Sequence, residues 1–313
     1  MSLPNPHPPL IVIVGPTAVG KTDLAIRLAQ RLNAEIISAD SRLFYRGMDI
    51  GTAKPSRAEM ALVPHYLIDV ANPDETWSLA LFQQKAHELI TDLHTRGKLP
   101  MLVGGTGQYI RSVTLGWTPP EVQPDPRLRK VLEMLAAQYS PYWLHEKLRV
   151  LDPISADRMD ARNLRRTVRA MEVILTSGQL FSSQRGASQS PYQLITIGLN
   201  RPRTALYSRI DERIDAMFAA GLLIEVQTML EKGYAGEPEL PSLSAIGYRQ
   251  AIAVLQGRMS IETAKVEMKR LTRMFVRRQS NWFKENDPTI KWFEMDDNTL
   301  SAVETFILAE LSN

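Results

Sequence analysis

The chain has no cysteine among its 313 residues, which excludes disulfides, thiol nucleophiles and zinc or iron-sulfur sites built on cysteine. No stretch approaches the roughly 20 apolar residues of a membrane-spanning helix. The apolar run after residues 1–9 is also too short for a signal peptide. We therefore expect a cytoplasmic protein without a membrane partner.

The chain also has little excess charge, since 37 basic residues face 34 acidic ones and the formal net charge is +3. Any nucleic-acid contact must then come from local clusters of basic residues. The five histidines show no metal-ligand spacing, so we expect no metal site made by protein side chains alone. A hydrophobic content of 44% allows one large domain with an insertion, or two domains.

Apolar runs alternate with helix-patterned segments in the first third of the chain, which predicts a mostly parallel sheet. The expected strands are 10–14, 35–38, 66–70 and 99–103. Helical patterns then dominate to about residue 192. Strands are expected again at 193–199 and 290–294, and helices at 204–232, 245–256 and 261–284 lie between these two strands. We predict an α/β fold, a P-loop NTPase-like parallel sheet flanked by helices, from residues 1–118 and 193–313. We expect residues 119–192 to form an all-helical insertion domain.

A phosphate-binding loop follows the first predicted strand and precedes a helix. Its sequence is GPTAVGKT, residues 15–22. In this context backbone amides surround an anion at the positive end of the helix, Lys21 reaches the outer phosphate, and the Thr22 hydroxyl can hold Mg²⁺. The residues predicted to bind the phosphate ester are Gly15, Thr17, Ala18, Val19, Gly20, Lys21 and Thr22.

Three other positions lie at predicted strand ends, where ligands bind in parallel sheets. Asp40 can accept a proton or hold metal-bound water, although a capping or turn role is the alternative. Asp69 is either a second, Walker-B-like carboxylate or a turn former. Thr106 stands in a run of glycines that lets a substrate approach the backbone, or that simply makes a tight turn.

Basic residues form two stripes at helical spacing. The first stripe, on a helix expected over 156–176, repels itself unless it meets a polyanion, and comprises Arg158, Arg162, Arg165, Arg166 and Arg169. The second stripe, near the C-terminus, could be a solvated face or could reach the phosphates, and comprises Lys265, Lys269, Arg273, Arg277 and Lys284.

Together these motifs resemble the bacterial tRNA dimethylallyltransferases, also called tRNA isopentenyltransferases. The similarity spans nearly the whole chain in order, through GPTAVGKT at 15–22, SADSRLFYRGMDIGTAKP at 38–55, PHYLIDV at 64–70, LVGGTGQYIRS at 102–112, RRTVRAMEV at 165–173, AIGYRQ at 245–250 and TRMFVRRQSNWF at 272–283. The sequence departs from the family at Leu43 and Met274, where glutamine is common, and at Leu81, where an acid is common. The departure at Leu43 puts a polar contact to the base in doubt.

The resemblance implies transfer of a dimethylallyl group from its diphosphate to N6 of adenosine 37 in tRNA, with Mg²⁺ as cofactor. It implies catalytic roles for Asp40, Lys21, Thr22 and Thr106, with Asp40 as the base. It places tRNA contacts at Asp40, Ser41, Arg42, Leu43, Thr106, Arg129, Arg165, Arg166, Thr167, Val168, Arg169, Ala245, Ile246, Gly247, Tyr248, Arg249 and Gln250. The insertion would clasp the anticodon stem-loop, and we expect a monomer.

Three other functions share some of these features. A relative that prenylates free adenine nucleotides needs the P-loop and Asp40 but has less need of the arginine stripe. A kinase of small metabolites would use Asp40 to activate a hydroxyl toward ATP. An RNA-binding switch would bind nucleotide without chemistry on the RNA.

Overall fold

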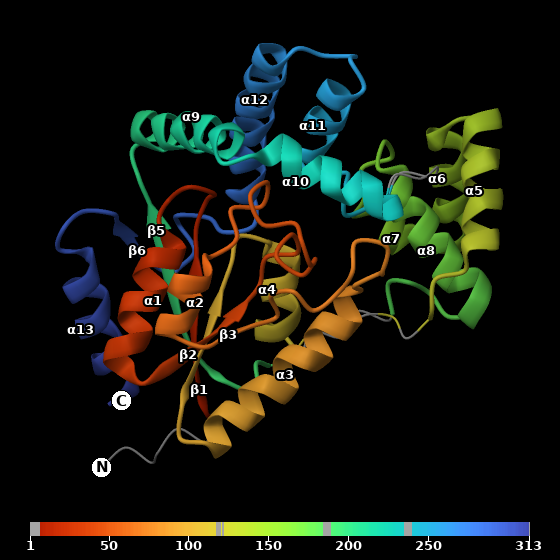
Figure 1. Cartoon of the computed structure of the whole chain (residues 1–313). Helices are drawn as coiled ribbons and strands as arrows, with labels where there is room; N and C mark the ends of the chain where they lie inside the picture. Colours follow the sequence, from red (N-terminus) through yellow and green to blue (C-terminus); the bar gives the residue numbers. More distant parts are fainter. Residues whose placement is uncertain (1–6, 117–119, 121, 184–188, 235–239, 313) are drawn as a thin grey trace. The chain divides into compact units, whose positions relative to one another are not determined.

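The computed structural model describes residues 7–116, 120, 122–183, 189–234 and 240–312 (Figure 1). The chain divides into two compact units, Met1–Thr114 with Ser190–Asn313, and Leu115–Gln189. The boundary predicted between residues 118 and 119 lies outside the described residues. None of the described helices is long and apolar enough to cross a membrane.

The first unit contains a parallel sheet of six strands, which confirms the predicted fold class. The strands are β1 Pro9–Val14, β2 Ala34–Ser38, β3 His65–Tyr66, β4 Leu99–Val103, β5 Gln193–Asn200 and β6 Lys291–Glu294, in the order β3-β2-β4-β1-β5-β6. The strand predicted at 66–70 was wrong beyond Tyr66. Leu67 and Asp69 have φ of 59° and 55°, which an extended strand does not allow.

Both faces of the sheet are covered, which explains why β1 is continuously apolar. Leu10, Val12 and Val14 belong to a hydrophobic cluster with α3 (Leu79–Thr95) and α4 (Gly107–Thr114). Ile11 and Ile13 belong to the cluster on the opposite face, which includes residues of α1 (Lys21–Leu32) and α13 (Thr299–Leu311). Because side chains alternate along β1, this strand packs against helices on both faces of the sheet.

A group of helices lies beyond the carboxyl ends of the strands (Figure 1). It consists of α9 (Arg203–Ala219), α10 (Leu222–Met229), α11 (Tyr248–Leu255) and α12 (Ile261–Gln279). The single helix predicted over 204–232 is divided at Gly221, whose φ of 98° suits glycine and interrupts the helix. The short helix α2 (Arg57–Leu62) and the turn η1 (Leu230–Tyr234) complete the helical elements described in this unit.

The second unit is helical, with α5 (Pro126–Gln138), α6 (Pro141–Leu151), α7 (Pro153–Asp157) and α8 (Leu164–Ser177) around a core of its own. The continuous helix predicted over 156–176 was wrong at its start. The Asp160 side chain accepts the Arg162 N–H and forms a turn, and the Asn163 side chain then caps α8 by accepting the Arg166 N–H.

Candidate active site

The P-loop connects β1 to α1 with a strongly curved backbone. Gly15, Ala18 and Gly20 have φ of 149°, 67° and 114°, in the region that favours glycine. A Cβ on Gly15 would lie 2.6 Å from the carbonyl oxygen of Leu199 in β5. The loop therefore fits closely between the strand ends and leads directly into the positive end of α1.

Cationic side chains bind the carbonyl oxygens of this loop. The Lys21 Nζ donates to the carbonyls of Gly15 and Pro16, each at 2.9 Å. Arg209, from α9, and Arg201, directly after β5, donate to two further P-loop carbonyls at 2.9 Å, those of Ala18 and Val19. Sequence reasoning missed both arginines, although the position of Arg201 at a strand end was an available signal.

A third arginine, Arg213 of α9, adds to the positive charge near the P-loop. Burial lowers the pKa of Lys21 from 10.5 to about 8, while Asp40 opposes this shift and Arg213 adds to it. Burial and Arg209 also lower the pKa of Arg213, and Asp40 again opposes the shift. Several partly desolvated cations thus converge on one loop, an arrangement that favours a multiply charged anion such as a diphosphate.

Asp40 lies just beyond the carboxyl end of β2. Its Oδ1 accepts the Arg42 N–H at 3.0 Å, and the preceding Ala39 N–H donates to the Val103 carbonyl of β4 at 2.8 Å. The turn role considered for Asp40 is therefore real, and it fixes the orientation of the carboxylate. Because Asp40 also acts electrostatically on Lys21, a general-base role remains compatible with this geometry.

Thr106 lies in the turn between β4 and α4. The Gly104 N–H donates to the Ile13 carbonyl of β1 at 3.1 Å, and a Cβ on Gly104 would lie 2.4 Å from the carbonyl oxygen of Ala39. The turn therefore fills the space between the ends of β1 and β2. Since β4 lies between these strands, the P-loop, Asp40 and Thr106 share one edge of the sheet.

The Asp69 carboxylate forms an ion pair with a lysine. Its Oδ1 accepts from the buried Nζ of Lys54 at 2.5 Å, and the same Nζ binds Asp49 and the Tyr45 carbonyl. Asp69 itself has a positive φ. The positive φ agrees with the turn-former interpretation, and the ion pair with Lys54 holds the segment that follows Asp40.

The predicted tRNA-contact segment 245–250 presents only some of its side chains. Ala245, Tyr248 and Gln250 have buried side chains. The Tyr248 hydroxyl donates to Glu225, whose carboxylate also accepts backbone N–H groups from residues 49–51 at 2.7–3.1 Å. In the same segment, Gly247 has no side chain to offer. In the other predicted contact segment, directly after Asp40, the side chains of Ser41, Arg42 and Leu43 are half-buried.

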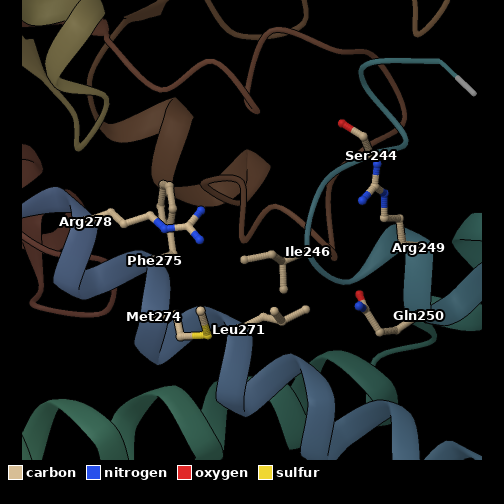
Figure 2. A pocket seen from close by; sticks show the side chains of 8 residues that line it. All are labelled: Ser244, Ile246, Arg249, Gln250, Leu271, Met274, Phe275 and Arg278. Atoms are coloured by element: carbon tan, nitrogen blue, oxygen red, sulfur yellow. The ribbon is translucent and has the colours of Figure 1, made fainter. Parts of the chain in front are cut away.

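Ile246 and Arg249 do line a cavity of about 160 Å³ between α11 and α12. Figure 2 shows its apolar floor and the arginine side chains at its margin. The lining residues are Ser244, Ile246, Arg249, Gln250, Leu271, Met274, Phe275 and Arg278. Met274, one of the family departures, thus makes part of an apolar hollow.

In the helical unit, Glu172 neutralises two of the predicted RNA-binding arginines. Its buried carboxylate accepts from Arg129 at 2.8 and 2.9 Å and from Arg169 at 2.5 Å. Burial alone would raise the pKa of Glu172, but these hydrogen bonds hold it below its ordinary value. The side chains of Thr167 and Val168, also predicted to contact tRNA, are buried.

The predicted arginine stripe is accordingly shorter than its sequence pattern. Arg158 and Arg162 precede α8, and Arg162 forms an ion pair with Asp160 at 2.7 Å. Arg165 is exposed and Arg166 half-buried on α8 itself.

The second stripe forms ion pairs with acidic side chains of α9. Lys265 and Lys269 reach Asp215 at 3.4 and 2.7 Å, and Arg273 reaches Asp211. Lys284 lies beyond the end of α12. The first three cations of the stripe are therefore paired with acids of the protein itself.

Magnesium fits the residues at the start of α1. The hydroxyl of Thr22 is an exposed oxygen donor beside the anion loop, and Mg²⁺ is commonly held by one or two protein oxygens together with substrate phosphates. Within the described parts of the chain, no three histidine or acidic side chains cluster as a metal site. A magnesium ion would therefore be held jointly by Thr22 and the phosphate ester.

A cavity of about 200 Å³ opens beside the P-loop. Gly15, Pro16 and Gln279 line it, together with Asn200, Ser280 and the acidic Glu285. Arg201, Arg203 and Arg277 supply positive charge, and apolar walls come from Leu206, Tyr207, Val276, Phe283 and Trp292. The combination of cations and apolar surface suits a small molecule with a charged head and a hydrocarbon tail.

Comparison with known proteins identifies close relatives. Residues 43–286 match the family model described as IPP transferase, and residues 8–72 match one described as isopentenyl transferase. A tRNA dimethylallyltransferase of Roseiflexus sp. (strain RS-1) is 51% identical over 276 residues, covering 88% of this chain and 90% of the relative. Another, from Thermomicrobium roseum, is 43% identical over 93% of this chain and 88% of the relative.

Solved structures of similar proteins agree with the fold. The full-length tRNA isopentenylpyrophosphate transferase of Bacillus halodurans matches with a TM-score of 0.72 and 40% identity, covering 97% of both chains. A eukaryotic dimethylallyltransferase acting on tRNA matches with a TM-score of 0.81 and 25% identity, over 96% of this chain and 77% of that one.

Proposed function

The chain belongs to the IPP transferase family, and from this premise we propose that it transfers a dimethylallyl group from dimethylallyl diphosphate to N6 of adenosine 37 in tRNA. The observation that carries the proposal is the sharing of one sheet edge by the P-loop, Asp40 and Thr106. A cationic cradle for the leaving group and a carboxylate for the N6 proton are the two requirements of this substitution.

In the proposed reaction, N6 attacks the allylic carbon C1 of the donor, the C1–O bond breaks, and diphosphate leaves with the bonding electrons. Lys21, Arg209, Arg213 and the P-loop amides stabilise the charge that develops on the diphosphate. Asp40 takes the proton from N6 and becomes neutral. Thr22 would hold a magnesium ion together with the phosphates, and that ion would add to the charge neutralisation.

The acceptor base must leave its stack to reach Asp40, because a stacked adenine cannot enter a site at the edge of a sheet. We propose that Thr106 and the segment 41–43 meet the extruded base. Surface groups for the RNA backbone include Arg165, Arg166 and Arg249. The helical unit, through α8, would then hold the anticodon stem-loop, and the enzyme would work as a monomer in the cytoplasm.

The test is nucleoside analysis by mass spectrometry after incubation with dimethylallyl diphosphate, Mg²⁺ and either tRNA or AMP. We expect the dimethylallyl adduct of adenosine in tRNA and none on AMP, and its loss when adenosine 37 is replaced. Product on AMP alone would favour the nucleotide-prenylating alternative. ATP consumption without an adduct would favour a kinase or a nucleotide switch. Size-exclusion chromatography of the active sample tests the monomer.

A further inference from the structure

Gln279, the last residue of α12, is a buried polar side chain that joins two loops of the candidate active site. It is 6% exposed. Its Oε1 accepts from the Thr17 backbone N–H at 2.9 Å and from the Thr17 hydroxyl at 3.3 Å, and its Nε2 donates to the Gly105 carbonyl at 3.1 Å. A primary amide can accept on one side and donate on the other, as this position requires.

The surroundings leave little freedom for this side chain. A Cβ on Gly105 would lie 2.3 Å from the Gln279 Nε2, so the close approach needs glycine. Just beyond Gln279, the Trp282 carbonyl accepts from Arg111 of α4 at 2.7 Å, and the Trp282 ring occupies the space above Gly107. The end of α12 is therefore fixed against the turn between β4 and α4 at more than one point.

In the proposed reaction the two loops contact different substrates, the prenyl donor and the acceptor base. The P-loop, which contains Thr17, binds the diphosphate that leaves, whereas the turn with Gly105 leads into Thr106 on the acceptor side. Transfer needs the two reacting atoms held about 3–3.5 Å apart, and a displacement near 1 Å can cost about 100-fold in rate. A rigid link between the loops therefore has a direct consequence for turnover.

We propose that Gln279 is a positioning residue that sets the separation of the P-loop and the Gly104–Thr106 turn. This inference deepens the proposed function and depends on it for the identity of the two substrates. Gln279 acts through Thr17 and Gly105, and contact with the reacting atoms is not required. The Thr17 amide is engaged by Gln279, so the amides that follow it in the loop are those that bind the anion.

The first test replaces Gln279 with methionine, which has similar length but cannot bridge the loops. We expect the rate of a single turnover at saturating tRNA and donor to fall at least about 30-fold, and inorganic diphosphate with Mg²⁺ to bind about 10-fold more weakly by calorimetry. The tRNA dissociation constant should stay within about 2-fold. Gln227→Met, at an exposed position of α10, is the matched control and should leave all three values unchanged.

The second test uses Gln279→Glu, because the introduced carboxyl can replace the amide only while it is protonated. Below its pKa it donates to the Gly105 carbonyl and accepts from Thr17; once ionised it donates nothing and repels both the Gly105 oxygen and the diphosphate. The donor kcat/KM of the variant, divided by that of the wild type, should rise at least about 10-fold from pH 8.5 to 6. A purely structural role predicts no such rise.

The outcomes separate failure of the inference from failure of the proposed function. Wild-type protein that forms no adduct on tRNA refutes the proposed function, while diphosphate binding by the variants still tests the link. A folded Gln279→Met protein with wild-type diphosphate affinity overturns the inference whatever the activity. So does a pH-independent ratio for Gln279→Glu, measured on protein whose circular dichroism and melting temperature match those of the wild type at each pH.

Discussion

Replacing Asp40 with asparagine separates its two roles, because asparagine keeps the side-chain oxygen that accepts the Arg42 N–H and loses only the capacity to take a proton. General-base catalysis typically contributes about 10²–10⁴-fold, which corresponds to about 3–5.5 kcal/mol in the activation barrier. We therefore expect Asp40→Asn to lower the single-turnover rate by a factor in this range. Its free energy of unfolding should change by less than about 0.5 kcal/mol.

The donor affinity should respond in the opposite direction. Asp40 raises the pKa of Lys21 but also repels an incoming diphosphate, and removing its charge relieves that repulsion. At pH 6, where Lys21 keeps its proton in both proteins, diphosphate should consequently bind Asp40→Asn at least as well as it binds the wild type. Asp40→Ala should match the asparagine variant in rate and lose about 1 kcal/mol more stability, since it also removes the hydrogen bond to Arg42.

The assay is rapid mixing of enzyme with radiolabelled donor and excess tRNA, followed by nucleoside analysis, so that product release does not mask the chemical step. Urea unfolding of each variant measures stability separately. A single-turnover rate for Asp40→Asn within about 3-fold of the wild type would refute the assignment, and the proton acceptor would then be another group or water.

Three further predictions concern Lys21, Glu225 and the arginines of α8. Donor kcat/KM should fall as pH rises through about 8, because Lys21 loses its proton there. Lys21→Arg should remove this inflection, since arginine keeps its charge. A wild-type profile that is flat across pH 7–9 would contradict the lowered pKa of Lys21. Glu225→Gln should lower the free energy of unfolding by about 2–4 kcal/mol, measured by urea unfolding. An amide cannot accept from all four N–H and O–H donors that face Glu225. A change below about 0.5 kcal/mol would show that the link to residues 49–51 contributes little to stability. Replacing Arg165 and Arg166 with alanine should reduce the slope of log affinity for tRNA against log salt by about 1–2, whereas Arg162→Ala, already paired with Asp160, should change it less; equal effects would mean that α8 does not face RNA.

Much of the fold and part of the site follow from local sequence patterns. The alternation of apolar runs and helical periods predicted the parallel sheet, and the glycines and lysine of the P-loop predicted the anion site, because these features depend on backbone geometry within about ten residues. The position of Asp40 after a buried strand was sufficient to place it at the same edge. Helix limits were less accurate, since Gly221 and the turn at Asp160 act through one or two residues inside an otherwise continuous pattern.

The sequence by itself determined the class of fold, the position of the P-loop and the family. Only the tertiary structure decided which distant side chains surround the loop, namely Arg201, Arg209, Arg213 and Gln279, and which cations are neutralised, as Glu172 neutralises Arg129 and Arg169. The physical reason is the distance along the chain over which each feature is determined. Secondary structure and loop conformation follow from neighbours along the chain, whereas the charge of a site depends on which buried faces pack together, and that is settled by the whole fold at once.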